Sequence, residues 1–182
     1  MKKLAKEIKN CKDAQQTRKL LVQFGHKFFN MIRREEVFKN VGMCLFLLRS
    51  GLFLLPGYLL SDYDREIGFL TPMRGQDPNF VSTSPESVKD KTILIVDVVT
   101  DSGLTFKRSA EFLKKAGAKE VVVAAIFGTK KSARDLEDFE HIDKAFVFDT
   151  SNTQKNGFLI PDVKYDVGDL LTNALYKFPQ MA

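Results

Sequence analysis

The sequence has no tryptophan, two cysteines and two histidines among its 182 residues. Cys11 and Cys44 lack partners at metal-binding or disulfide spacing, so we expect neither a zinc site nor a disulfide framework. Such sparse cysteine is typical of a reducing compartment, and we expect a cytoplasmic protein. His26 and His141 have no neighbouring ligand residues in the sequence, and we expect both to be surface or hydrogen-bonded structural residues.

A membrane span and a secretory signal are also not expected. Residues 41–60 are apolar over nearly the length of a bilayer, but Arg49 lies near their middle and Pro56-Gly57 interrupts the run. We interpret this segment as a buried strand over residues 43–48, a turn at residues 49–51 and a core helix. The amino terminus is rich in lysine but has no apolar signal-peptide core behind it.

The charge balance is mildly basic, with 28 Lys and Arg against 23 Asp and Glu. A formal net charge of +5 favours anionic ligands such as phosphates. The basic residues are interspersed with acidic ones rather than gathered, so we expect no nucleic-acid binding.

The pattern of apolar residues predicts one α/β domain over residues 1–182. Two apolar runs, residues 92–96 and 120–128, flank an amphipathic helix that begins near Leu104. This strand–helix–strand unit predicts a parallel sheet covered on both faces, which is a three-layer fold. Residues 1–40 read as a helical arm. Residues 71–90 read as a flexible hood that holds one short strand at residues 79–83.

The segment ILIVDVVTDSGLTF, residues 93–106, carries the chemistry. An apolar strand runs into Asp97, and small polar residues follow before the helix. At the carboxyl end of a parallel strand such a loop can turn its backbone N–H groups toward an anion, and the helix dipole adds attraction. The plainer interpretation is helix capping by Asp101, Ser102 or Thr105. Neither of the two common glycine-rich nucleotide loops is present.

Four segments in order resemble the type I phosphoribosyltransferases, in particular the uracil branch, in which a single Asp occupies the phosphoribosyl-diphosphate motif. Besides the segment above, LLRSGLFLLPGYL is similar to the Leu-Arg-Ala-Gly-Leu pyrophosphate loop of that branch. IGFLTPMRG is similar to the strand before its hood, and KNGFLIPDVKYDVGDLL to its base-recognition loop. The resemblance implies the type I phosphoribosyltransferase fold, with a mobile hood and N-terminal helices.

The resemblance also implies a reaction: transfer of a phosphoribosyl group from phosphoribosyl diphosphate to a pyrimidine base, uracil, giving UMP and pyrophosphate. Asp97 would accept from the ribose hydroxyls and stabilise developing positive charge. Arg49 would neutralise the leaving pyrophosphate, and Arg74 would close over it from the hood. The remaining substrate-binding residues implied are Asp101, Ser102, Gly103, Leu104, Thr105, Ser50, Gly51, Leu159, Ile160, Asp166, Gly168 and Asp169.

The resemblance implies magnesium as a cofactor, bound through pyrophosphate rather than through protein ligands. The phenylalanine-rich N-terminal helices, together with the family, imply a homodimer. The chain departs from the family at the base loop, where Pro-Gly-Leu-Gly becomes Pro161-Asp162-Val163-Lys164. A second hypothesis therefore stays open, in which a catalytically weak or inactive relative binds phosphoribosyl diphosphate or a nucleotide and acts as a regulator.

Overall fold

Among the residues that the structure describes, six strands form one sheet in the order β3-β2-β1-β4-β5-β6, in which β3 alone runs antiparallel to its neighbour. The structure is a computed structural model that describes residues 2–48, 50–72, 77–81 and 83–149. The strands are β1 (Val41–Leu47), β2 (Glu66–Thr71), β3 (Asn79–Val81), β4 (Thr92–Thr100), β5 (Glu120–Gly128) and β6 (Lys144–Asp149). The predicted parallel sheet is confirmed.

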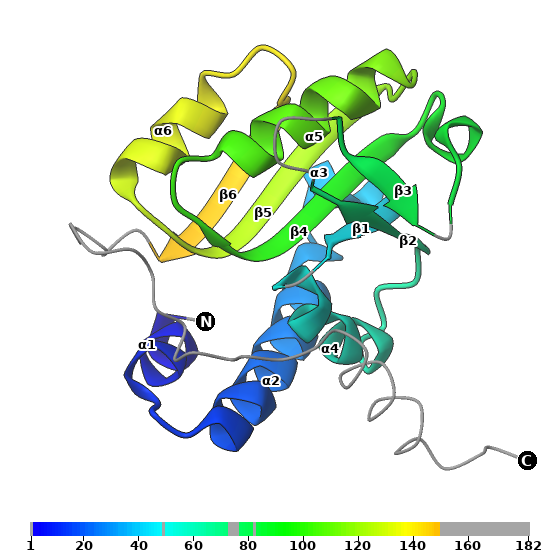
Figure 1. Cartoon of the computed structure of the whole chain (residues 1–182). Coiled ribbons are helices and arrows are strands. Elements are labelled where there is room, and N and C mark those ends of the chain that lie inside the picture. The colour runs from blue at the N-terminus through cyan, green and yellow to red at the C-terminus, as the bar shows by residue number, and fades with distance from the viewer. Residues whose placement is uncertain (1, 49, 73–76, 82, 150–182) are drawn as a thin grey trace, which may run out of the picture.

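Helices cover both faces of this sheet and make three layers (Figure 1). One face carries α1 (Lys2–Asn10), α2 (Ala14–Ile32) and α4 (Leu55–Leu59). The short helix α3 (Glu36–Lys39) and the 3-10 turn η1 (Gly51–Leu54) add buried side chains to the same face. The other face carries α5 (Leu104–Lys115) and α6 (Lys130–Glu137). Because β1, β4 and β5 are buried on both faces, their sequences are continuous apolar runs.

Successive side chains of β4 point to opposite faces of the sheet and belong to two separate hydrophobic clusters, one on each face. Leu94 and Val96 belong to the cluster on the α2 face, whereas Ile93 and Ile95 pack under α5. Phenylalanines dominate the α2 side, where the rings of Phe28 and Phe29 lie 4.8 Å apart.

The long apolar stretch at residues 41–60 divides into β1, η1 and α4, as its interruptions predict. Within the described ranges, no helix is long and apolar enough to cross a bilayer.

Three elements differ from the sequence-based expectation. Strand β4 continues through Thr100 rather than ending before Asp97, because the β-branched Val98 and Val99 keep the backbone extended beside β5. Helix α6 was not predicted. The segment at residues 71–90, expected to be a flexible hood with one short strand at residues 79–83, holds β3 and also a second 3-10 turn, η2 (Pro85–Val88), whose Val88 is fully buried.

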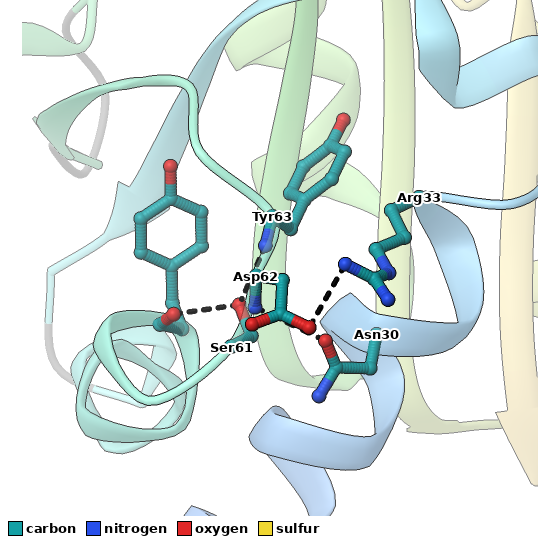
Figure 2. A network of polar contacts seen from close by, with 6 residues as sticks. Asn30, Arg33, Ser61, Asp62 and Tyr63 are labelled. Carbon is teal, nitrogen blue, oxygen red and sulfur yellow. Dashed lines mark hydrogen bonds and ion pairs between the residues drawn. The ribbon is translucent and has the colours of Figure 1, made fainter.

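Hydrogen bonds and an ion pair join the end of α2 to the loop after α4 (Figure 2). Asn30 Oδ1 accepts from the Asp62 amide at 3.1 Å, and Arg33 Nη1 lies 2.9 Å from Asp62 Oδ2. Tyr63, the residue after Asp62, is buried, and its hydroxyl donates to the Phe38 carbonyl at 3.0 Å. The buried bond joins this loop to α3, and we expect it to contribute more to stability than the exposed ion pair.

We therefore expect Tyr63→Phe to lower the free energy of unfolding by about 1–1.5 kcal/mol, because it removes a buried hydrogen bond and leaves the Phe38 carbonyl with only the Asn40 N–H as donor. Asp62→Ala removes only an exposed ion pair and is expected to cost under about 1 kcal/mol. Urea denaturation of the two variants checks the order. A larger loss for Asp62→Ala would contradict it.

Candidate active site

The predicted site lies at the carboxyl ends of the parallel neighbours β1 and β4. Ser50, in the turn after β1, donates a short hydrogen bond from its hydroxyl to Asp97 Oδ1 on β4. The two residues are 47 positions apart in the sequence, and the parallel pairing of the strands brings them together. The structure thus joins the segment expected to bind pyrophosphate to the residue expected to bind ribose.

Gly51 seats this turn against β4. A Cβ atom added there would lie 2.7 Å from the Val96 carbonyl oxygen and 3.7 Å from the Asp97 Cα. Any larger residue would push the turn away from the strand, so glycine at this position is a condition of the Ser50–Asp97 contact.

Asp97 lies inside the strand, paired with Ala125, and only 8% of its surface is exposed. A narrow apolar gap beside it has no room for a water molecule and is lined by Phe24, Phe28, Leu54, Ala124, Ala125, Ile126 and Phe148. Burial raises the pKa of Asp97 from 3.8 to about 7, although hydrogen bonds from Ser50 and from the backbone of Val98 and Val99 act in the opposite direction. The ligand-free carboxyl group therefore titrates near neutral pH.

Residues 101–103 form the turn between β4 and α5. Gly103 is the N-cap of α5 and has φ +74°, a left-handed conformation that glycine adopts without strain. Ser102 Oγ accepts from the Leu104 amide at 3.4 Å, and the first backbone bond of the helix runs from Lys107 N–H to the Gly103 carbonyl at 3.0 Å. Asp101, Ser102 and Thr105 are exposed.

This helix start can bind an anion. Because Gly103 carries no side chain, the cap itself supplies no side-chain acceptor for the first turn. The dipole of a 12-residue helix adds to the attraction. The alternative from the sequence was side-chain capping by Asp101, Ser102 or Thr105. The N-cap is Gly103 instead, and of the three residues Ser102 accepts from a first-turn amide, that of Leu104.

Helix α6 contacts the end of β4 and the turn that follows it. Ser132 Oγ donates to the Thr100 carbonyl at 3.3 Å, and the Leu136 side chain would lie 3.1 Å from a Cβ added at Gly103. The sequence signal for this helix was the Thr129-x-x-Ser132 spacing, which forms a capping box. Serine in place of the usual Glu or Gln made that signal weak.

Not every predicted site residue can be placed. Ser50 and Gly51 follow β1 and contact β4 at Asp97, and residues 101–105 follow the end of β4 at the same edge of the sheet. The other predicted site residues lie outside the described residues: Arg49, Arg74, Leu159, Ile160, Asp166, Gly168 and Asp169.

Fold and site together define a protein of the phosphoribosyl transferase class, and comparison with known families agrees. Residues 62–157, more than half of the chain, match the phosphoribosyl transferase domain. The chain belongs to this family. The match includes β4, Asp97 and the start of α5, but not the Ser50–Gly51 turn.

Similarity to individual proteins is more distant. Over 133 residues the chain is 28% identical to the uracil phosphoribosyltransferase of Arthrobacter sp. strain FB24, a match that covers 69% of this chain and 62% of that enzyme. The chain thus spans about three fifths of the length of that curated relative.

Solved structures share the fold. The AQ2163 protein from Aquifex aeolicus superposes with a TM-score of 0.64 at 18% identity, over 81% of each chain. The orotate phosphoribosyltransferase of Mycobacterium tuberculosis H37Rv, solved with inorganic phosphate, superposes with a TM-score of 0.56 at 12% identity, over 82% of this chain and 95% of that one. The type I phosphoribosyltransferase fold is therefore confirmed.

The raised pKa of Asp97 predicts a pH-dependent cost in stability. Folded Asp97 keeps its proton up to pH about 7, whereas an unfolded aspartate releases it near 3.8, so ionisation destabilises the fold as pH rises through that interval. Asp97→Asn does not ionise. We expect its advantage in unfolding free energy over the natural protein to grow between pH 4 and pH 8, by at most about 4 kcal/mol at 1.36 kcal/mol per pKa unit.

Urea denaturation across this pH range measures the trend. Asp138→Asn, which changes an exposed carboxylate after α6, is the matched control and should follow the natural protein. Parallel stability curves for Asp97→Asn and the natural protein would contradict the assigned burial.

Proposed function

We propose that this chain transfers the phosphoribosyl group of phosphoribosyl diphosphate to a pyrimidine base, with uracil as the first candidate. The observation that carries the proposal is the junction at the sheet edge. There a buried carboxylate, held by the turn after β1, stands on the strand that leads into the glycine-capped start of α5.

The 5′-phosphate would bind at the start of α5. Backbone N–H groups of residues 102–105 would donate to it, and Ser102 and Thr105, which are both exposed, would add their hydroxyls. The ribose would then lie toward Asp97, whose carboxylate accepts from the 2′- and 3′-hydroxyls. The substrate would span the three residues between Asp97 and the turn.

Chemistry at the anomeric carbon would rest on position and charge. As pyrophosphate leaves, positive charge develops on the ribose ring, and the ionised carboxylate of Asp97 would stabilise it. Because this carboxylate lies among apolar side chains, its effect is larger than it would be in water.

The pyrophosphate would contact the turn after β1, where Arg49 is expected to neutralise its charge and Arg74 to close over it. Magnesium, when bound, would supply further neutralisation of the leaving group. Magnesium carried by the pyrophosphate oxygens, rather than by protein ligands, stays a prediction from the resemblance.

Uracil is proposed from the name of the curated relative and from the resemblance of residues 155–171 to a uracil-binding loop. That loop would provide Leu159 and Ile160 as apolar contacts, with Asp166, Gly168 and Asp169 near the base. Its altered Pro161-Asp162-Val163-Lys164 stretch favours the second candidate, a regulator that binds phosphoribosyl diphosphate or a nucleotide without turnover. A homodimer and a cytoplasmic location stay predictions from the sequence.

The test is pyrophosphate release from phosphoribosyl diphosphate and magnesium with a panel of pyrimidine and purine bases. We expect turnover with uracil. We also expect Asp97→Asn to lower kcat/KM by roughly 10²–10³-fold, the usual cost of removing one electrostatic contact to the transition state. Asp138→Asn is the control with unchanged activity.

The outcomes separate the two candidates. Saturable binding of phosphoribosyl diphosphate without release of pyrophosphate for any base would overturn the enzyme and favour the regulator. No binding at all would overturn both.

A further inference from the structure

We propose that Ser50 is a positioning residue for Asp97: its hydroxyl holds one carboxylate oxygen so that the other is presented to the ribose. The inference rests on the proposed function, because it assigns a second role to a residue of the same site. It extends that function, since it makes the turn after β1 part of ribose recognition as well as of pyrophosphate binding.

The contact depends on the serine that this chain has at position 50. The corresponding segment of the uracil phosphoribosyltransferases reads Leu-Arg-Ala-Gly-Leu, whereas this chain reads Leu48-Arg49-Ser50-Gly51-Leu52. Alanine has no hydroxyl and cannot donate a hydrogen bond. Because Gly51 packs closely against β4, residue 50 lies within hydrogen-bond distance of Asp97, and the serine hydroxyl there is the donor.

Two of the protein's donors share one carboxylate oxygen. Ser50 Oγ and the Val98 N–H, at 2.7 Å, both donate to Oδ1, and the Val99 backbone also hydrogen-bonds to the carboxylate. We assign Oδ2 to the ribose hydroxyls. Two donors on one oxygen also stop rotation of the carboxylate, so the oxygen assigned to substrate is fixed before substrate arrives.

The surroundings of Asp97 make the Ser50 hydroxyl important. The side chains lining the adjacent gap are apolar: Phe24 and Phe28 from α2, Leu54 from η1, three residues of β5 and Phe148 from β6. Within the described part of the chain, no ionisable side chain acts on the pKa of Asp97, and Arg49 lies outside it. Ser50 is therefore the described side chain that counters desolvation.

Loss of the hydroxyl should change the pH dependence of the site. The ionised form of Asp97 disappears as pH falls through its pKa, which burial has already raised to about 7. A hydrogen bond to a charged group corresponds to about one pKa unit, so in Ser50→Ala we expect the pKa of Asp97 to rise by about one unit. Loss of positioning lowers activity at every pH, and the pKa rise adds to it at low pH, so the activity ratio between natural protein and variant should be roughly tenfold larger at pH 6 than at pH 9.

The experiment reads the carboxyl group directly. The ¹³C resonance of the Asp97 carboxyl carbon, assigned by its absence in Asp97→Asn, is titrated by NMR in the ligand-free full chain. Ser50→Ala should move the midpoint up by about one pH unit. Ser50→Thr, which keeps a hydroxyl, should restore it. Ser109→Ala removes a buried hydroxyl that has no partner among the described residues, and should leave the midpoint unchanged.

Two results would overturn the proposal: an unchanged midpoint in Ser50→Ala, or an equal shift in Ser109→Ala. The activity ratio between the natural protein and Ser50→Ala is the second measurement. A loss of activity that is the same at pH 6 and at pH 9 would also overturn the proposal. Because the NMR titration needs no turnover, a shifted midpoint in a protein that releases no pyrophosphate supports the positioning role while the proposed enzyme fails.

Discussion

The site depends on one unfavourable constraint, a carboxylate buried at the carboxyl end of a parallel sheet. Desolvation disfavours the charge of Asp97, and hydrogen bonds from Ser50 and the following backbone only partly offset it. A protein that retains such a group sacrifices stability at neutral pH. The proposed ligand binding would explain the arrangement, because ribose hydroxyls would supply the hydrogen bonds that water no longer does.

The parallel order of the strands places other segments of the chain next to the buried carboxylate. Because β1, β4 and β5 are parallel neighbours, the turn after β1, the end of β4 and the start of α6 all lie at one edge. Gly51 lets the first turn approach β4, and Gly103 lets the chain reverse into α5. Helix α6 then fixes the Thr100–Gly103 region through Ser132 and Leu136. Each contact is modest, but together they fix where a phosphate and a ribose could lie.

Much of this could be predicted from the sequence. The continuous apolar runs of β4 and β5 and the amphipathic pattern of α5 specify a parallel unit, and the small residues after Asp97 mark its ligand-binding end. The end of β4 was predicted wrongly, because Asp97 resembles a strand terminus, yet pairing with Ala125 outweighs that local preference. Helix α6 was missed because it is short and mostly polar.

The contact between Ser50 and Asp97 could not be predicted, since no local pattern relates residues 47 positions apart. The same holds for the raised pKa of Asp97, which depends on aromatic side chains from α2 and β6.

The central claim is that the peptide N–H groups of residues 102–105 bind a phosphate while Asp97 accepts from the attached ribose. A crystal structure of the protein with ribose 5-phosphate tests it most directly. The account predicts phosphate oxygens about 2.7–3.2 Å from those backbone nitrogens and ribose hydroxyls on Asp97. A phosphate bound elsewhere, with the start of α5 left to solvent, would contradict it.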